Sequence, residues 1–271
     1  MRLRIKFQPV KKHWEYEKPV KLKFFDANVY VGQPTIPKGK PLKNADDLIR
    51  EMDKHGIEKA LVWHIAQHDV FPQEGNVLLI REISGRERLL GCWTILPPQT
   101  GEVIEKNFFE RMKKNRIYAL RLFPRPHNFI LDKIVFEDFF TRLTENNVPL
   151  VFDLQRAVSS YESIYNILKD CPGLECILCN IGVWSVNRYV WPLLEKFPGL
   201  YVETSLLALE DGGIEETVKR FGSGRLVFGT GLPERYPEAS VLSLLHAEIS
   251  DEDKEKIAYN NMKEIIQRVL L

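Results

Sequence analysis

The sequence predicts an α/β protein, and within that class a (β/α)₈ TIM barrel. Short apolar runs rich in β-branched residues recur eight times, and each is nearly continuous in hydrophobicity, as parallel strands covered on both faces should be. Segments with the apolar period of an amphipathic helix separate these runs. The chain length of 271 residues is close to the ~250 residues typical of such a barrel.

The predicted strands occupy residues 22–31, 59–65, 89–95, 117–123, 148–154, 174–181, 200–205 and 225–230. The first helix is predicted between Asn44, which can cap its N-terminus with Asp47 three residues on, and Gly56, which follows its end. Further helices are predicted at about 74–86, 102–115, 136–146, 159–170, 188–196, 214–222 and 239–247. A last helix, capped by Ser250, is expected to close the structure.

An open, doubly wound sheet is the alternative architecture. No Gly-x-Gly-x-x-Gly segment follows a predicted strand, and Gly-x-x-x-x-Gly-Lys-Ser/Thr occurs nowhere in the chain. These motifs mark dinucleotide and phosphate binding on open sheets. Their absence, together with the eightfold alternation, favours the closed barrel.

The charge of the chain is nearly balanced, with 38 basic and 37 acidic side chains and a net charge of +1. This balance gives no case for nucleic acid or anionic lipid as a partner. The expected partner is a small molecule at the barrel mouth. The sequence leaves open whether the protein forms a homo-oligomer. No run of eighteen uncharged apolar residues appears, and the start lacks an apolar segment of signal-peptide length, so no membrane span and a cytoplasmic location are predicted.

The first 23 residues depart from this balance, because basic side chains clearly outnumber acidic ones there. We expect residues 1–23 to form a basic arm packed on the barrel through Phe7, Trp14 and Tyr16, with residues 24–271 as a single barrel domain. The alternative is a segment that touches an acidic ligand or partner.

Cys176 and Cys179 have the spacing of a metal or redox motif. They lie inside an apolar run predicted as a buried strand, where residues three apart point to opposite faces. No second cysteine pair supplies the remaining ligands of a zinc ion. The pair is therefore interpreted as part of a strand.

Active sites of such barrels lie at the carboxyl ends of the strands. Polar residues that end the predicted strands, in place of the Val or Ile that an interior strand prefers, are Asp26, Asn28, Tyr30, His64, Arg121, Asp153, Gln155, Asn180, Glu203, Ser205 and Thr230. A polar residue at a strand end can also simply meet solvent. These residues are the candidates for a site.

Several strand ends carry short motifs. The first reads Asp26-Ala-Asn28-Val-Tyr30-Val-Gly32, the fourth Ala119-Leu-Arg121-Leu-Phe123-Pro124, the fifth Pro149-Leu-Val-Phe-Asp153, the sixth Asn180-Ile181-Gly182 and the eighth Phe228-Gly229-Thr230-Gly231-Leu232-Pro233. This framework resembles the amidohydrolase-related branch of the amidohydrolase superfamily, which comprises metal-dependent (β/α)₈ hydrolases and decarboxylases. The resemblance runs from Phe24 nearly to the end and implies an amidohydrolase-like barrel.

The resemblance also implies where the family's metal ligands would lie. The family has histidines in the first, fifth and sixth strand motifs and an aspartate in the eighth, and this chain has Asn28, Tyr30, Asp153, Asn180 and Gly231 at those positions. Of the five, only Asp153 keeps a donor that zinc prefers. We therefore expect no cofactor and no zinc site of the family type.

Other donors could rebuild a metal site with oxygen-rich ligation suited to Mg²⁺ or Ca²⁺. The candidates are His64, His68, Asp26, Asp153, Glu203 and Glu234, although their spacing forms no motif.

Two functions remain open. In the first, the protein is a hydrolase or carbon–carbon lyase for a small, possibly carboxylated substrate, and it works without the family's metal. Asp153 would then be the general base or nucleophile, Arg121 would hold a substrate carboxylate, and His64 would transfer protons. Asn28, Tyr30, Asn180, Glu203 and Thr230 would bind the substrate. In the second, the barrel is inactive and binds a small ligand or serves as a protein-interaction scaffold.

Overall fold

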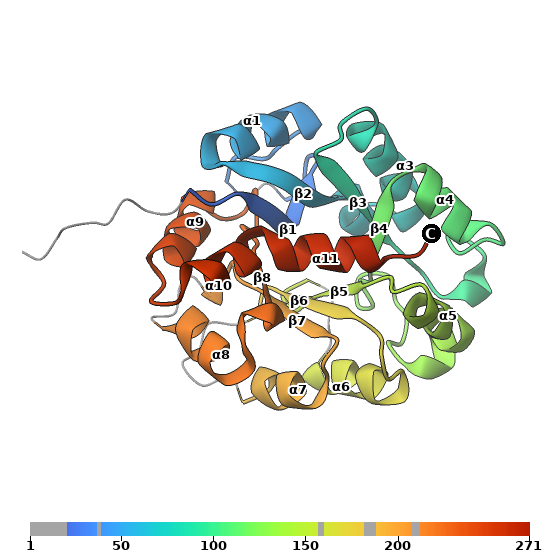
Figure 1. Ribbon diagram of the computed structural model, residues 1–271. Coiled ribbons are helices and arrows are strands. Elements are labelled where there is room, and N and C mark those ends of the chain that lie inside the picture. Colours follow the sequence, from blue (N-terminus) through green and yellow to red (C-terminus); the bar gives the residue numbers. More distant parts are fainter. Residues whose placement is uncertain (1–20, 37–38, 157–159, 182–187, 208–211) are drawn as a thin grey trace, which may run out of the picture.

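The structure is a computed structural model, and it describes residues 21–36, 39–156, 160–181, 188–207 and 212–271 (Figure 1). The predicted basic arm lies outside the described residues, apart from its last three. Its expected packing contacts, Phe7, Trp14 and Tyr16, also lie outside them, and so does Gly182 of the sixth-strand motif.

Eight parallel strands form one sheet in chain order, which confirms the predicted barrel topology. They are β1 (Phe24–Val31), β2 (Ile57–His64), β3 (Leu89–Thr94), β4 (Ile117–Arg121), β5 (Leu150–Asp153), β6 (Cys176–Cys179), β7 (Leu200–Glu203) and β8 (Leu226–Val227). Backbone hydrogen bonds from Ala27 N to Phe228 O (2.9 Å) and from Gly231 N to Asn28 O (3.1 Å) join the first strand to the segment after β8. The barrel is therefore nearly closed, although β8 is shorter than the predicted 225–230.

The helices alternate with the strands and cover the outside of the barrel (Figure 1). They are α1 (Ala45–His55), α2 (Ala66–Asp69), α3 (Pro72–Ile83), α4 (Phe108–Lys114), α5 (Lys133–Glu145), α6 (Tyr161–Asp170), α7 (Val190–Lys196), α8 (Gly213–Phe221), α9 (Pro237–His246), α10 (Asp251–Glu255) and α11 (Asn261–Arg268), with short 3₁₀ turns η1 (Pro98–Thr100) and η3 (Ser223–Arg225) and a π-helical turn η4 (Lys256–Asn260). The predicted caps of α1 are confirmed, since the Asn44 side chain accepts from Asp47 N and Gly56 adopts φ 68°.

Two helix predictions need correction. The helix expected at 102–115 begins only at Phe108, because the apolar Val103 and Ile104 pack against the core from a loop. The four-residue helix α2 was not predicted, since one turn is too short to show a helical period. This short helix follows β2 directly and therefore lies at the carboxyl ends of the strands.

The apolar core has two parts. One fills the space between the sheet and the helices, and the other fills the barrel interior. Cys176 belongs to the first and Cys179 to the second, so the two thiols point to opposite faces of β6, as the strand interpretation predicts. Both are buried free cysteines.

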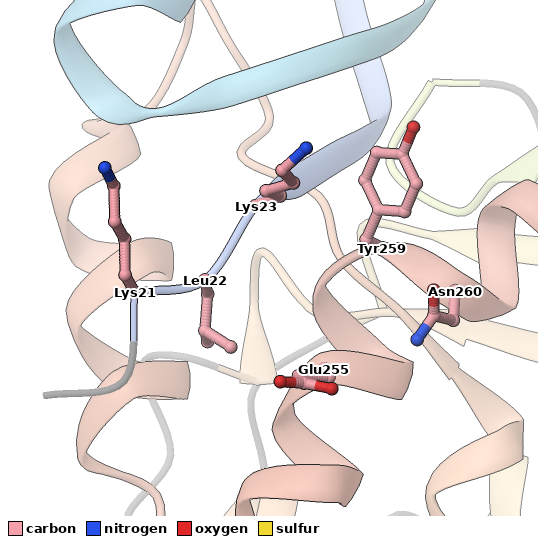
Figure 2. A pocket seen from close by; sticks show the side chains of 6 residues that line it. All are labelled: Lys21, Leu22, Lys23, Glu255, Tyr259 and Asn260. Atoms are coloured by element: carbon pink, nitrogen blue, oxygen red, sulfur yellow. The ribbon is translucent and has the colours of Figure 1, made fainter.

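The C-terminal helix closes the end of the barrel where the strands begin (Figure 1). Met262 and Ile265 of α11 join the interior core, and Tyr259 of η4 packs against Phe25 with the ring centroids 5.8 Å apart. A hollow of 270 Å³ lies beside this plug, between the chain that enters β1 and the turn of η4 (Figure 2). The opposite end of the barrel is left to the polar strand ends.

Candidate functional site

Polar residues of β1, β4, β5 and β7, together with Asn180 directly after β6, meet at the carboxyl end of the barrel. Asn28, Arg121, Asp153 and Glu203 are at most 4% exposed, and Asn180 is 7% exposed. Interior positions of this kind normally carry apolar side chains, because burying an unpaired charge is costly. Their polar groups are accordingly joined to one another.

Arg121 lies at the centre of this group. Its guanidinium donates from Nη1 to Asp153 Oδ2 at 3.4 Å and from Nη2 to Asn28 Oδ1 at 3.3 Å, and it stacks on the Trp63 ring at 4.8 Å. Asn28 Nδ2 in turn donates to Glu203 Oε2 at 3.0 Å and to Asn180 Oδ1 at 3.4 Å. The predicted site residues of five different strands therefore form one hydrogen-bonded network.

The carboxylates of the network are fixed by backbone donors. Asp153 Oδ1 accepts from the amides of Gln155 and Arg156, both at 3.0 Å. Glu203 accepts from the amide of Ser205 and, at 2.9 Å, from its hydroxyl. Such bonds hold the side chains in one conformation and satisfy their lone pairs.

Burial shifts the proton affinity of two carboxyl groups. It raises the pKa of Glu203 to about 7, against the hydrogen bonds from Ser205, and it raises the pKa of Asp26 to about 6. A Cβ atom at position 229 would overlap Glu203 Oε1, so glycine is required there. Glu203 therefore exchanges its proton near neutral pH.

Thr230 and His64 make no direct hydrogen bond to the side chains of the network. Thr230 donates its amide (3.1 Å) and its hydroxyl to Asp26, which links the segment after β8 to β1, and Asp26 Oδ1 also accepts from Asn28 N at 3.0 Å. His64 Nδ1 accepts from Ala66 N at 3.1 Å, its ring lies against Gly32, and burial lowers its pKa to about 4. The structure thus holds His64 neutral, with no hydrogen bond to the other predicted residues that lie within the described segments.

A second layer of charged side chains covers the network, and the sequence did not single out its arginines. Arg156 pairs with Glu234 and lies over the rings of Tyr30 and Trp63, 5.4 and 5.8 Å from their centroids. Tyr30, a predicted site residue, donates its hydroxyl to Glu234 Oε1 at 3.2 Å. Burial raises the pKa of Tyr30, so its phenol stays protonated.

Arg235 is the other arginine of this layer. It donates from Nη1 to Asn180 Oδ1 at 2.6 Å and from Nη2 to Gln155 Oε1 at 3.1 Å. A Cβ atom at Gly231 would overlap Arg235 Nη1, so the guanidinium occupies the room that a side chain at position 231 would need. Arg156 follows the end of β5 by three positions, which is the signal that could have identified it, whereas Arg235 lies eight positions beyond β8.

A cavity of 410 Å³ opens beside this second layer. It is lined by Pro34, Thr35, Ile36, His68, Asp69, Arg156 and Glu234, which come from the segments that follow β1, β2, β5 and β8. The cavity therefore lies at the mouth of the barrel, where barrels of this type bind their ligands.

Two further features concern metals and membranes. Within the described segments, no group of three or more His, Cys, Asp and Glu side chains is arranged to hold a metal ion. No helix in those same segments is long and apolar enough to cross a membrane.

The chain is similar to known proteins in both sequence and fold. The family model described as Amidohydrolase matches residues 36–265. No curated protein matches the sequence.

Solved structures are similar over 91% of this chain. They include an uncharacterized TIM-barrel protein from Bordetella bronchiseptica (TM-score 0.72, 16% identity, 99% of that chain covered) and 2,6-dihydroxybenzoate decarboxylase from Rhizobium (0.72, 14%, 99%). A third is a probable 2-pyrone-4,6-dicarboxylic acid hydrolase from Acinetobacter baumannii with citric acid bound (0.69, 12%, 100%). At these identities the likeness establishes the fold.

Proposed function

The chain belongs to the amidohydrolase family, and from this premise we propose that it is a hydrolase or decarboxylase of a small carboxylated compound that works without the family's metal ion. The substrate would bind at the barrel mouth, above the buried network. The cytoplasmic location and a possible homo-oligomer stay predictions from the sequence.

The observation that carries the metal-free part is the position of two guanidinium groups. Arg121 donates to Asn28 and to Asp153, and Arg235 donates to Asn180 and fills the room beside Gly231. These partners stand where the resemblance implies metal ligands. The residues present do not fit a divalent cation, because fixed positive charges occupy the ligand side of the site and because amides are poor substitutes for imidazole.

Arg235 supports the choice of a carboxylated substrate. Its guanidinium donates to two neutral amide oxygens, and within the described segments no carboxylate lies at ion-pair distance from it. A planar guanidinium with that surrounding retains the capacity to bind a carboxylate through two parallel hydrogen bonds. Two of the similar structures carry names that refer to acids, a dihydroxybenzoate and a pyrone dicarboxylic acid.

The remaining predicted residues support and complete the site. Arg121 and Asp153 form a buried ion pair below the substrate position. Arg121 donates to Asn28, Asn28 donates to Asn180, and Asn180 accepts from Arg235, so the pair positions both asparagines. Glu203, with its pKa of about 7, is the group whose proton can be taken or given at neutral pH.

Ligand binding without turnover is the second candidate. It is favoured by the pairing of Arg121 with Asp153, both 1% exposed, because this pair leaves neither side chain open to a substrate. Turnover of any substrate by chelator-treated protein would decide against it.

The experiment is a thermal-shift screen of small mono- and dicarboxylates on chelator-treated protein. We expect at least one acid to raise the unfolding temperature of the wild type and of the control Arg50→Met, an exposed arginine of α1, and to raise that of Arg235→Met much less. We also expect no shift on adding micromolar zinc. Equal stabilisation of Arg235→Met, or binding that requires zinc, would contradict the proposal.

A further inference from the structure

The mouth cavity contains a histidine that the network does not use. His68 is the third residue of the short helix α2, which places it directly after β2 and on the cavity wall. Its Nδ1 lies 2.7 Å from Asp69 Oδ1, and the second oxygen of Asp69 accepts from Thr35 N at 2.7 Å. The histidine side chain is 20% exposed and the aspartate 14%.

These contacts fix which nitrogen of His68 carries the proton. Burial raises the pKa of Asp69, but the hydrogen bonds from His68 and Thr35 together outweigh this effect. The pKa of Asp69 therefore lies below its ordinary value, and the group is a carboxylate. A carboxylate only accepts, so Nδ1 donates, and in the neutral imidazole Nε2 carries the lone pair. The ring is held edge-on to Phe123, with centroids 4.8 Å apart and an angle of 83°. Among the described residues, Nε2 has no hydrogen-bond partner.

A cation also lines this cavity. Arg156 lines it together with Glu234, and the guanidinium is held between this ion pair and the ring of Tyr30. The lining also carries the carboxylates of Asp69 and Glu234, so the cavity as a whole is not cationic, but the Arg156 guanidinium can donate a hydrogen bond to a carbonyl oxygen on which negative charge develops. The cavity therefore joins an oriented imidazole to an electrostatic partner.

We infer that His68 is the general base of a hydrolytic reaction in this cavity, that Asp69 is its positioning residue, and that the substrate is an ester or lactone of a small carboxylic acid. The inference rests on the proposed function, because a hydrolase that works without a metal ion needs a side chain to activate water, and His68 would be that side chain. His68 Nε2 takes a proton from water while the water oxygen bonds to the carbonyl carbon. The carbon–oxygen bond to the leaving group then breaks, and that oxygen receives the proton from Nε2.

The test measures hydrolysis of two probes, mono-4-nitrophenyl succinate and 4-nitrophenyl acetate, by chelator-treated protein. We expect His68→Gln to lower kcat by about 100-fold or more, with little change in KM, because a positioned base contributes roughly 10²–10⁴-fold. The control His246→Gln, in α9, should keep the wild-type rate. Added imidazole should restore part of the activity of His68→Gly.

Asp69→Asn tests the positioning role. An amide can donate to Nδ1 and thereby move the proton to Nε2, so kcat should fall while KM stays close to that of the wild type. A merely structural aspartate would instead change stability and KM together.

The outcomes separate this inference from the proposed function. Equal rates of wild type and His68→Gln overturn the role of His68 and leave the metal-free function standing. If the wild type hydrolyses neither ester, the hydrolytic inference falls, while the carboxylate screen still judges the proposed function. Activity that returns only with zinc contradicts the proposed function, whatever the effect of His68→Gln.

Discussion

The two ends of the barrel differ in whether their ion pairs are exposed or buried. At the end where the strands begin, Lys23 pairs with Glu58 at 2.8 Å, and their side chains are 72% and 39% exposed. Tyr259 donates to the same glutamate at 3.3 Å, beside the hollow shown in Figure 2. At the mouth, Arg121 pairs with Asp153 at 3.4 Å, and both are 1% exposed.

This contrast indicates which charges the fold can lose without consequence. Exposed pairs contribute little, because water screens them and because long side chains lose entropy when they are held in one geometry. Replacing a buried pair by apolar residues is often neutral or even stabilising. Removing only one partner strongly destabilises the folded state, because the other charge stays buried without compensation. Buried charge at the mouth is therefore better explained by function than by stability, and the following variants test this difference.

The largest effect is expected from breaking the buried pair. Arg121→Met leaves Asp153 as an uncompensated charge and should lower the free energy of unfolding by about 3–5 kcal/mol. Lys23→Met, at the other end, should leave the denaturant midpoint unchanged. Urea unfolding of the two variants checks this pair of expectations, and similar midpoints for both would show that the two ends of the barrel do not differ in this way.

Much of the fold was predictable because the barrel is built from local patterns. The eight apolar runs and the caps of α1 are signals within single segments, and they identified the strands and the topology correctly. The prediction for the eighth strand ran too far. Phe228 and Gly229 continue the apolar run, but the Phe228 amide donates to Ile257 O and the Gly229 amide donates to the Thr204 side chain.

The site was predictable only in part, because its connections join distant segments. Polar residues at strand ends identified Asn28, Arg121 and Glu203 as candidates, and the structure brings them together. The sequence could not show that Arg235 fills the room at Gly231, since that depends on how a loop folds back. Nor could it show that His68 and Asp69 face a cavity, because a one-turn helix has no period to reveal its faces.

The next effect concerns pH and has opposite signs at the two ends. The pKa of Glu203 is about 7 when folded, against 4.5 ordinarily, so the folded state holds its proton more tightly and this contribution is lost as pH rises from about 4.5 to 7. The side chain in Glu203→Gln stays neutral at every pH. Between pH 4.5 and 7 the free energy of unfolding of this variant should therefore rise by about 2–3 kcal/mol relative to that of wild type.

Glu58 is the matched control at the other end. Its hydrogen bond with Lys23 lowers its pKa, so it stabilises the folded state above pH 4.5 and loses that contribution in acid. The stability of Glu58→Gln should therefore fall relative to that of wild type as pH rises. The effect should be small, because the group is exposed and screened by water. Thermal unfolding of both variants at a series of pH values measures the two slopes, and slopes of the same sign would refute the contrast.

The smallest effect is expected at two glycines with the same backbone conformation. Gly56, before β2, has φ 68° and no atom within 4 Å of the position that a Cβ atom would take, whereas Gly231 at the mouth has φ 69° and Arg235 Nη1 in that position. Alanine at either site costs about 1–2 kcal/mol for the left-handed conformation. Gly231→Ala must also displace the guanidinium from Asn180, so it should be the less stable variant and the one that loses stabilisation by carboxylates. Equal unfolding temperatures, with carboxylate binding kept in both, would mean that Arg235 relocates freely and that the room at Gly231 has no part in the site.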